Sequence, residues 1–245
     1  MSFSFQAKYL GMTPYQCPAV FNMIPFVEHF FGVYHVKGGM SEISVQLAKL
    51  AQECGAEIRL NSPVKQLIVD KNAPNKSAFG FGKKPTVQGV KLASGEEIMA
   101  KQVIMNADFS YNIQDLVPDA EQTLNKWRPS QIPKKKHSSS TFMIYAALDK
   151  YYDHIPVHNI VFSRDFWTQV KRLDSGHIPS DPSFIYVRNA SKVDPTLSPQ
   201  GKSGLYFLVP VPNLLQQQGS EDYWLNENNK QQYRETILKR VEEQL

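Results

Sequence analysis

Two adjacent glycines, Gly38 and Gly39, are the first residues of this chain whose type and spacing could serve chemistry. Glycine adopts a positive φ without steric penalty, so such a pair lets the backbone turn sharply and approach a flat ligand closely. The pair could equally be a tight turn between a strand and a helix, and the two interpretations are compatible. Met40 completes this candidate segment.

A second set of residues has the chemistry of metal ligands: Asp149, Asp153, His154 and His158. The two histidines would share a face only on a helix, and Pro156 between them argues against one. No metal site is therefore expected here.

The cysteines Cys17 and Cys54 support neither a thiol nucleophile nor a zinc site, because their spacing fits no zinc motif and neither has a histidine beside it. One possible pair is not a disulfide framework, so a reduced, cytosolic compartment is the expectation. No apolar run is long enough to span a membrane, and no signal peptide is visible at the start of the chain.

A basic run, Lys134-Lys135-Lys136-His137, could bind anionic lipid or nucleic acid, or it could be a solvated loop. Charge alone supports nucleic acid, with no motif or aromatic residues beside it, so no nucleic-acid partner is expected. The chain is 42% hydrophobic and 20% charged with a net charge of +4, a composition that excludes disorder and a coiled coil.

The elements that must position these residues follow from the apolar pattern. The clearest is an amphipathic helix over 41–54 with Gly55 as its C-terminal stop, whose apolar face is Ile43, Leu47, Leu50, Ala51 and Cys54. The dense apolar stretch 17–31 predicts short helices that are either buried core or the wall of an apolar cavity. Strands are predicted over 33–36, 57–60, 64–69, 86–92, 97–99, 102–105, 141–148, 159–162, 183–188 and 205–209, and further helices over 111–132, 164–173 and 227–245.

The order of these features resembles the carotenoid (phytoene) desaturase family, and within it the members that act on C30 precursors. Four stretches carry the resemblance in the same order as in the family: FGVYHVKGGMSEISVQLAKLAQECGAEIRLNSPVKQLIVD, VIMNADFSYNIQDLVPD, VHNIVFSRDF and DPTLSPQGKSGLYFLVPVP. The resemblance implies an α/β (α+β) chain that is part of an FAD/NAD(P)-binding, amine-oxidase-like fold. Its substrate domain would have a mixed or antiparallel sheet with covering helices.

The resemblance also implies a division of the chain. Residues 1–36 would be an apolar helical part of the substrate domain, 37–110 part of the FAD-binding domain, and 111–245 the rest of the substrate domain, incomplete at its C-terminal end. The sequence has no G-x-G-x-x-G loop to hold the pyrophosphate of FAD, and the family's C-terminal FAD segment is not found. The chain therefore resembles the middle of such an enzyme and is expected to be inactive alone.

By the same resemblance the cofactor is FAD, and the residues expected to contact it are Gly38, Gly39, Met40, Val64, Asn106 and Ala107. Val64 matches the strand whose backbone meets the adenine end of FAD, although it could be a plain strand residue. Asn106 and Ala107 match the end of a strand that closes onto the nucleotide half of FAD, and Asp108 could instead be the N-cap of the next helix.

The activity implied is removal of hydrogen from a long apolar polyene, which extends its conjugation. The residues expected to contact this substrate are Phe21, Phe26, Phe30 and Tyr145, within apolar walls at 20–31, 142–145 and 206–208. No catalytic base can be named. A substrate that partitions into lipid implies a cytoplasmic protein attached peripherally to a membrane surface. The alternatives are a related carotenoid end-group oxidase or isomerase, and a non-catalytic lipid-binding or membrane-binding module.

Overall fold

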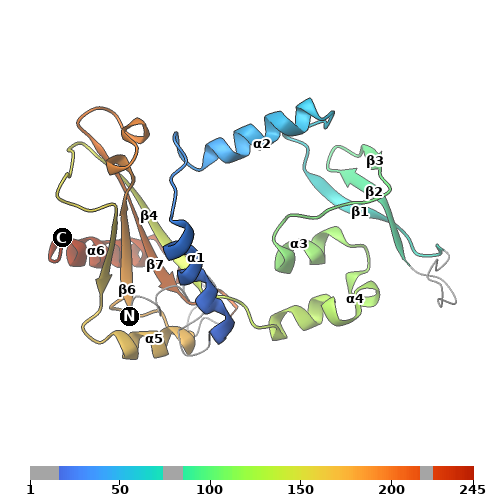
Figure 1. Ribbon diagram of the computed structural model, residues 1–245. Helices are drawn as coiled ribbons and strands as arrows, with labels where there is room; N and C mark the ends of the chain where they lie inside the picture. Colours follow the sequence, from blue (N-terminus) through green and yellow to red (C-terminus); the bar gives the residue numbers. More distant parts are fainter. Residues whose placement is uncertain (1–16, 74–84, 216–222) are drawn as a thin grey trace. The chain divides into compact units, whose positions relative to one another are not determined.

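The computed structural model describes residues 17–73, 85–215 and 223–245 (Figure 1). The chain forms two compact units: the first combines Met1–Leu50 with His137–Leu245, and the second is Ala51–Lys136. The boundaries of these units follow residues 50 and 136, whereas the sequence placed functional boundaries after residues 36 and 110. The functional boundaries describe which ligand each part binds, and they stay a prediction.

The first unit is built on a four-stranded sheet in the order β4-β7-β6-β5, with every neighbouring pair antiparallel. The strands are β4 (Ser140–Leu148), β5 (His158–Phe162), β6 (Phe184–Asn189) and β7 (Ser203–Val211). Alternation along β7 places Leu205, Phe207 and Val209 in the core, and it sends Tyr206 and Leu208 to the opposite face. The four strands predicted in this half of the chain are confirmed.

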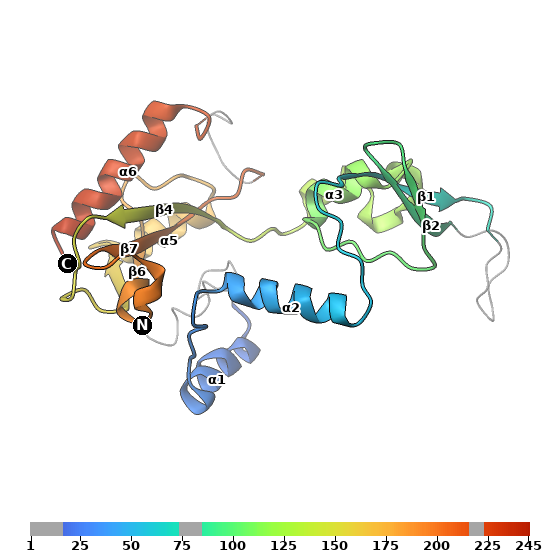
Figure 2. The same cartoon turned by 90° about the horizontal axis from the view of Figure 1, so that it is seen from above.

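Helix α6 (Glu227–Glu242) covers the core face of this sheet (Figure 2). Tyr233, Ile237 and Val241 recur every three or four residues and enter the core, with Ile237 completely buried. The Asn226 side chain accepts a hydrogen bond from the amide of Asn228 and caps the helix. The helix predicted over 164–173 is also present, as α5 (Phe166–Asp174).

The N-terminal elements of the first unit are η2 (Ala19–Asn22), α1 (Met23–Phe31) and α2 (Ser41–Glu53), which runs on into the second unit. Both helices expose their apolar residues: Phe26 is 59% exposed, Phe30 69% and Leu47 61%. Of the two interpretations of the stretch 17–31, plain core is therefore wrong for these α1 side chains, because no described element covers them. An open hollow of about 660 Å³ lies over Asn22, Pro25, Phe26 and His29 of α1.

The second unit contains an antiparallel sheet in the order β1-β2-β3, made by β1 (Val64–Asp70), β2 (Thr86–Leu92) and β3 (Glu97–Met99). Helix α3 (Phe109–Leu116) packs against β1. The single helix expected over 111–132 is instead divided into α3, α4 (Ala120–Thr123), η3 (Asn125–Trp127) and η4 (Pro129–Lys134). Pro118 and Pro129 explain the division, because proline lacks the amide proton that a continuing helix needs.

Three strands that the sequence predicted, over 33–36, 57–60 and 102–105, do not form. A strand needs a neighbour to pair with, and none of the described strands lies alongside these segments. Their side chains accordingly find no core: Val33 is 73% exposed, Leu60 79% and Ile104 92%.

Gly89 holds the β2–β3 pairing together in the second unit. It lies opposite Met99, and a Cβ added to it would overlap the carbonyl oxygen of Ile98. We therefore expect Gly89→Ala to destabilise this sheet by about 1–3 kcal/mol, the cost typical of forcing an extra carbon into packed structure. Urea unfolding measures this loss. The matched control is Gly204→Ala in β7, where the nearest atom, Ser191 Oγ, lies at 3.8 Å and stability should hold. Equal effects of the two changes would contradict the steric argument.

Candidate functional site

The glycine turn of the first unit has the backbone conformation that the sequence predicted. Gly38 and Gly39 have φ values of 85° and 95°, in the region that other residues avoid. A Cβ on Gly38 would meet Glu42 Cγ at 3.0 Å, and one on Gly39 would meet Leu197 Cδ2 at 3.3 Å. The turn therefore requires glycine both for its conformation and for its close approach to η6 (Pro195–Leu197).

Asp194 fixes this turn from the far end of the sequence. Its Oδ2 accepts a hydrogen bond of 2.7 Å from the amide of Gly38. Its Oδ1 accepts two more from Thr196, from the amide at 3.0 Å and from the hydroxyl at 2.6 Å. One carboxylate thus caps η6 and holds the glycine turn against it.

His35 and Arg188 extend this cluster from Asp194 to the sheet. Nε2 of His35 lies 3.3 Å from Asp194 Oδ2, and Nδ1 of His35 lies 3.0 Å from Nη2 of Arg188 on β6. A guanidinium can only donate, so Nδ1 accepts and Nε2 carries the proton that His35 donates to Asp194. A chain of hydrogen bonds from Arg188 through His35 and Asp194 to Gly38 therefore connects the sheet to the turn.

The electrostatics of Asp194 follow from these bonds. The Thr196 hydroxyl and then the Gly38 amide stabilise its ionised form, and together with the Thr196 amide and His35 they hold the pKa of Asp194 well below its usual range. These bonds favour the ionised carboxylate, although its residue is only 4% exposed.

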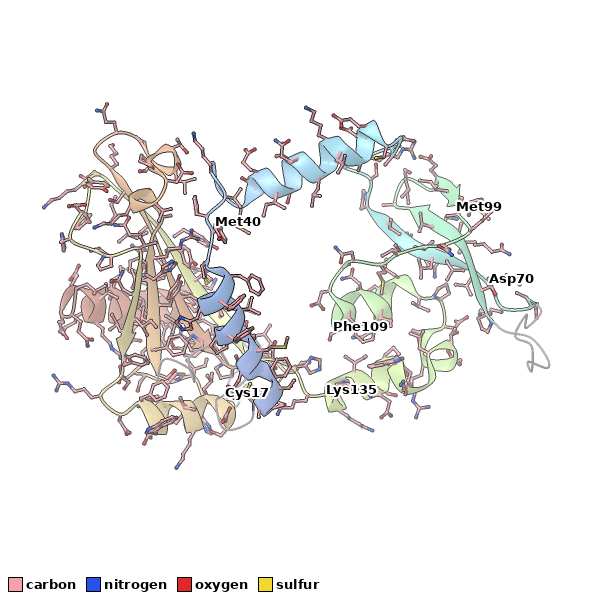
Figure 3. All side chains as sticks on the ribbon, viewed as in Figure 1. Cys17, Met40, Asp70, Met99, Phe109 and Lys135 are labelled. Carbon is pink, nitrogen blue, oxygen red and sulfur yellow. The ribbon has the colours of Figure 1, made fainter. Side chains whose placement is uncertain are left out.

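Sequence reasoning missed Asp194, His35 and Arg188. Part of the signal was present, because Asp194-Pro195-Thr196 has an N-cap residue followed by proline at the first helical position. That pattern indicates a local cap. It does not show that the second carboxylate oxygen binds an amide 156 residues away in the sequence. Met40, which the sequence also singled out, directly follows the turn and is 63% exposed (Figure 3).

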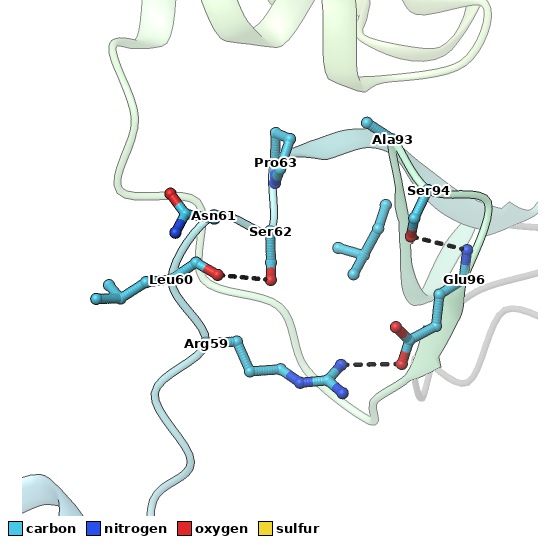
Figure 4. Close-up of a pocket in the computed structure, with 9 residues that line it drawn as sticks. Arg59, Leu60, Asn61, Ser62, Pro63, Ala93, Ser94 and Glu96 are labelled. Carbon is cyan, nitrogen blue, oxygen red and sulfur yellow. Dashed lines mark hydrogen bonds and ion pairs between the residues drawn. The ribbon is translucent and has the colours of Figure 1, made fainter.

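A cavity of about 470 Å³ in the second unit is lined by residues 59–63, which directly precede Val64, and by residues from 92 to 96 (Figure 4). We call it the cavity beside Val64, although Val64 itself is not part of its lining. Val64 opens β1 opposite Leu92, and the register shifts between Val64 and Gln66. Pro63 and Leu92, the neighbours of Val64 along the chain and across the ladder, both contribute to the wall. The lining is Arg59, Leu60, Asn61, Ser62, Pro63, Leu92, Ala93, Ser94 and Glu96.

The charged side chains at this cavity pair with one another. Arg59 donates from Nη1 to Glu96 Oε1 at 2.9 Å, and its Nε lies 2.9 Å from Glu57 Oε1. The hydrogen bond and charge of Glu96, followed by the charge of Glu57, raise the pKa of Arg59. Two carboxylates thus flank one guanidinium and leave an excess of negative charge, so the cavity suits an uncharged polar group better than a phosphate.

Asn106 and Ala107 lie in the same unit as Val64, between an extended segment and α3. Asp108 immediately precedes α3, and its carbonyl oxygen accepts the amide of Asn112 at 2.9 Å. Asp108 therefore occupies the N-cap position that the sequence offered as the alternative to cofactor contact. The structure does not bring Asn106 or Ala107 to the lining of the cavity. Their contact with FAD stays a prediction.

The expected apolar walls at 142–145 and 206–208 divide between the two faces of the four-stranded sheet. Phe142 and Ile144 pack in the core, so only alternate residues can face a substrate. Tyr145 is 78% exposed on the other face, where its ring lies 6.1 Å from that of Tyr206. Tyr186 continues the row, 5.8 Å from Tyr206.

Two of the residues considered as metal ligands are engaged by other side chains. His158 Nδ1 lies 2.6 Å from the hydroxyl of Tyr186, and Asp153 is paired with Lys192. Across residues 17–73, 85–215 and 223–245, no group of three or more metal-ligating side chains comes together. Within the same ranges no helix has the length and apolar character that crossing a bilayer requires.

Comparisons with known proteins place the whole of this architecture in one family. The family model for flavin-containing amine oxidoreductases matches residues 3–244. The chain belongs to this family. The predicted amine-oxidase-like fold class is thereby confirmed, with antiparallel sheets in the described residues.

Several curated members of this family are similar to the chain. It is 42% identical over 213 residues to a 4,4'-diapophytoene desaturase (4,4'-diapolycopene-forming) of Methylomonas sp, which covers 87% of this chain and 39% of that protein. It is 36% identical over 211 residues to an all-trans-zeta-carotene desaturase of Myxococcus xanthus, covering 86% and 37%. It is 32% identical over 240 residues to a 4,4'-diapophytoene desaturase of Staphylococcus haemolyticus, covering 98% and 44%. The predicted resemblance to carotenoid desaturases is confirmed, and the chain spans about two fifths of the length of these relatives.

The family implies FAD, and the cavity beside Val64 fits one part of that cofactor. An adenine ring or a ribose is uncharged at neutral pH, and the cavity is concave with its charges already paired. The glycine turn has the positive φ that permits close approach to a ligand, but the Gly38 amide is already bound by the carboxylate of Asp194. Neither place suits the pyrophosphate, which prefers unpaired backbone amides at a helix start.

Proposed function

We propose that this chain is the central portion of an FAD-dependent carotenoid desaturase that acts on a long apolar polyene of the phytoene or dehydrosqualene type. One observation carries the proposal: 42% identity to a 4,4'-diapophytoene desaturase across 87% of this chain. That match is long enough to include residues of both compact units.

In this proposal each unit has its own part in binding. The backbone at Val64 and the cavity beside it hold the adenine end of FAD, with Asn106 and Ala107 closing on the nucleotide half. The turn Gly38-Gly39-Met40 separates the flavin from the substrate region, and Asp194 fixes its position. FAD supplies an acceptor for two electrons and one hydrogen of the polyene, while a proton leaves the neighbouring carbon.

The polyene contacts the exposed aromatic side chains of the first unit. Phe26 and Phe30 stack at 5.4 Å on α1, and Phe21 lies on η2, which leads directly into α1. Tyr145 offers its ring on the open face of the sheet. Exposed apolar surface of this kind supports binding of a lipid-soluble molecule. It also supports a cytoplasmic protein attached peripherally to the membrane from which such a substrate comes.

A chimera tests the proposed function. The matching stretch of the Methylomonas sp 4,4'-diapophytoene desaturase is replaced by the corresponding residues of this chain, and the hybrid is produced in cells that make 4,4'-diapophytoene. We expect coloured products that have lost two hydrogens for each new double bond, measured by absorbance and mass spectrometry. The intact Methylomonas enzyme is the control.

The mass of the product separates the alternatives. A product that gains oxygen would identify an end-group oxidase, and a product of unchanged mass an isomerase. A hybrid that binds FAD as well as the control does, yet leaves the substrate unchanged, would contradict the proposal.

A further inference from the structure

The positive charge of this chain is concentrated in one short segment of the second unit. Lys126, Arg128, Lys134, Lys135 and Lys136 lie within residues 126–136, which contain no acidic residue. The whole chain has 27 basic and 23 acidic residues, so removing these five leaves 22 basic against 23 acidic. The net charge of +4 therefore comes from this segment.

An exposed tryptophan stands at the centre of the segment. Trp127 is 42% exposed, and the ammonium groups of Lys126 and Lys135 lie 5.2 and 4.8 Å from the centre of its ring. Phe109, 41% exposed, meets the same ring edge-on at 5.3 Å. Phe109 and Lys135 are both labelled in Figure 3, at the start of α3 and just after η4. We call Trp127, Phe109, Lys126 and Lys135 the Trp127 cluster.

Local structure fixes the backbone around the cluster. Trp127 donates its amide to the carbonyl of Leu124 at 2.8 Å, and Lys135 donates to Ile132 at 3.0 Å. Ile132 is only 2% exposed and anchors η4 in the unit. Lys126 and Lys135 are thus held at the ring by two separate turns, η3 and η4.

The acidic residue closest to this segment in the sequence, Glu121, does not pair with these two lysines. Both carboxylate oxygens of Glu121 accept from Ser130, from its hydroxyl at 2.5 Å and its amide at 3.1 Å. These two bonds, the hydroxyl first, lower the pKa of Glu121. Its ion pair is with Arg128, whose Nε lies 3.6 Å from Glu121 Oε1. Among the described residues no carboxylate forms an ion pair with Lys126 or Lys135, so their ammonium groups are accessible to a partner outside the chain.

We propose that the Trp127 cluster is the surface by which this protein binds an anionic lipid membrane. Tryptophan prefers the boundary between headgroups and acyl chains, where its amphipathic ring is partly buried. Lysines keep their ammonium groups at the headgroups and are attracted to anionic lipid. Nucleic acid fits less well, because single strands are bound by several successive stacking platforms and the cluster offers one accessible indole. The inference rests on the proposed peripheral attachment, and desaturation plays no part in it.

Sedimentation with vesicles tests this surface on the complete 245-residue chain. We expect binding to phosphatidylcholine vesicles that contain phosphatidylglycerol, and little binding to phosphatidylcholine alone. The double change Lys126→Glu with Lys135→Glu should weaken binding by about tenfold or more, since each basic residue near an anionic surface contributes appreciably. Trp127→Ala should weaken sedimentation too. In a Trp167→Phe, Trp224→Phe background, where Trp127 is the remaining tryptophan, its fluorescence should shift to the blue with vesicles that contain phosphatidylglycerol and stay unshifted with phosphatidylcholine alone.

The matched control reverses two lysines of the same unit outside the cluster, Lys65→Glu with Lys101→Glu. It makes the same change in net charge and should keep binding within about twofold, because the attraction falls off over a Debye length. Circular dichroism confirms that each variant is folded.

Four outcomes would overturn the proposal. The cluster variants could bind as tightly as the unchanged chain, the control could lose as much as they do, or vesicles with and without phosphatidylglycerol could bind equally. Stronger retention on single-stranded RNA, lost in the same variants, would identify the cluster as a nucleic-acid surface. Any of these results leaves the pigment assay of the chimera unaffected, so failure of this surface is distinguishable from failure of the proposed function.

Discussion

Replacing Asp194 by alanine is expected to lower the thermal unfolding midpoint of the chain by several degrees. The substitution removes the acceptor for the Gly38 amide at 2.7 Å and for both donors of Thr196. It also removes the carboxylate that accepts the hydrogen bond from His35 Nε2, while Nδ1 of His35 stays next to Arg188. Buried donors that lose a charged acceptor are among the few causes of large single-residue effects. Differential scanning calorimetry measures the shift.

The carboxylate of Asp194 also predicts how that shift depends on pH. Its hydrogen bonds lower the pKa of the folded state below the unfolded value of about 4. A group with a depressed folded pKa stabilises the protein above its unfolded pKa and loses this contribution as the pH falls. The difference in midpoint between the unchanged chain and Asp194→Ala should therefore be constant near neutrality and narrow progressively below about pH 4.

Two further variants separate geometry from charge. Asp194→Asn keeps one oxygen acceptor but turns an NH₂ group toward one of the donors. Its unfolding midpoint should therefore lie between those of the unchanged chain and of Asp194→Ala. Asp153→Ala removes a carboxylate that is 79% exposed and should leave the midpoint unchanged. In the chimera, Asp194→Ala should reduce coloured product while leaving bound FAD in place, as expected of a residue that positions the turn. A midpoint for Asp194→Ala equal to that of Asp153→Ala would refute the anchoring role.

The contrast between Gly38 and Asp194 shows what this sequence could reveal. Positive φ at Gly38 and Gly39 was predictable because the preference belongs to glycine itself. The bond that fixes the turn was not, because its acceptor comes from a separate element and only tertiary structure brings the two together. The cavity beside Val64 has the same origin: Pro63 is local, whereas Leu92 and Glu96 reach it through the pairing of β1 with β2.

The strands follow the same physical rule. Segments with a described partner, such as β1 with β2 or β4 with β7, form where the alternating pattern predicted them. The segments 33–36, 57–60 and 102–105 have similar side chains but no strand beside them in the described part of the chain. Strand propensity measures how well a residue fits a pleated, half-buried surface, so it cannot create a strand without that surface.

Helices α2 and α6 also show that tertiary structure decides which apolar face is buried. An alanine substitution on the apolar face of each helix should therefore have different effects on stability. Ile237→Ala in α6 is expected to cost about 3 kcal/mol, the range seen when a buried isoleucine leaves a cavity. Ile237 is completely buried between α6 and the sheet. Urea unfolding followed by circular dichroism measures the change in the free energy of unfolding.

Leu47→Ala in α2 is the matched control, because it also shortens an aliphatic side chain in an amphipathic helix. Leu47 is 61% exposed, so its truncation should change stability by less than about 0.5 kcal/mol. The apolar face of α2 was the clearest in the sequence, yet α6 is the helix that the first unit buries. Periodicity shows which face of a helix can be covered, and the burial of Ile237 comes from the sheet that covers it. A loss from Leu47→Ala as large as that from Ile237→Ala would mean that the α2 face is covered in solution, and a concentration-dependent midpoint would identify the cover as a second copy of the chain.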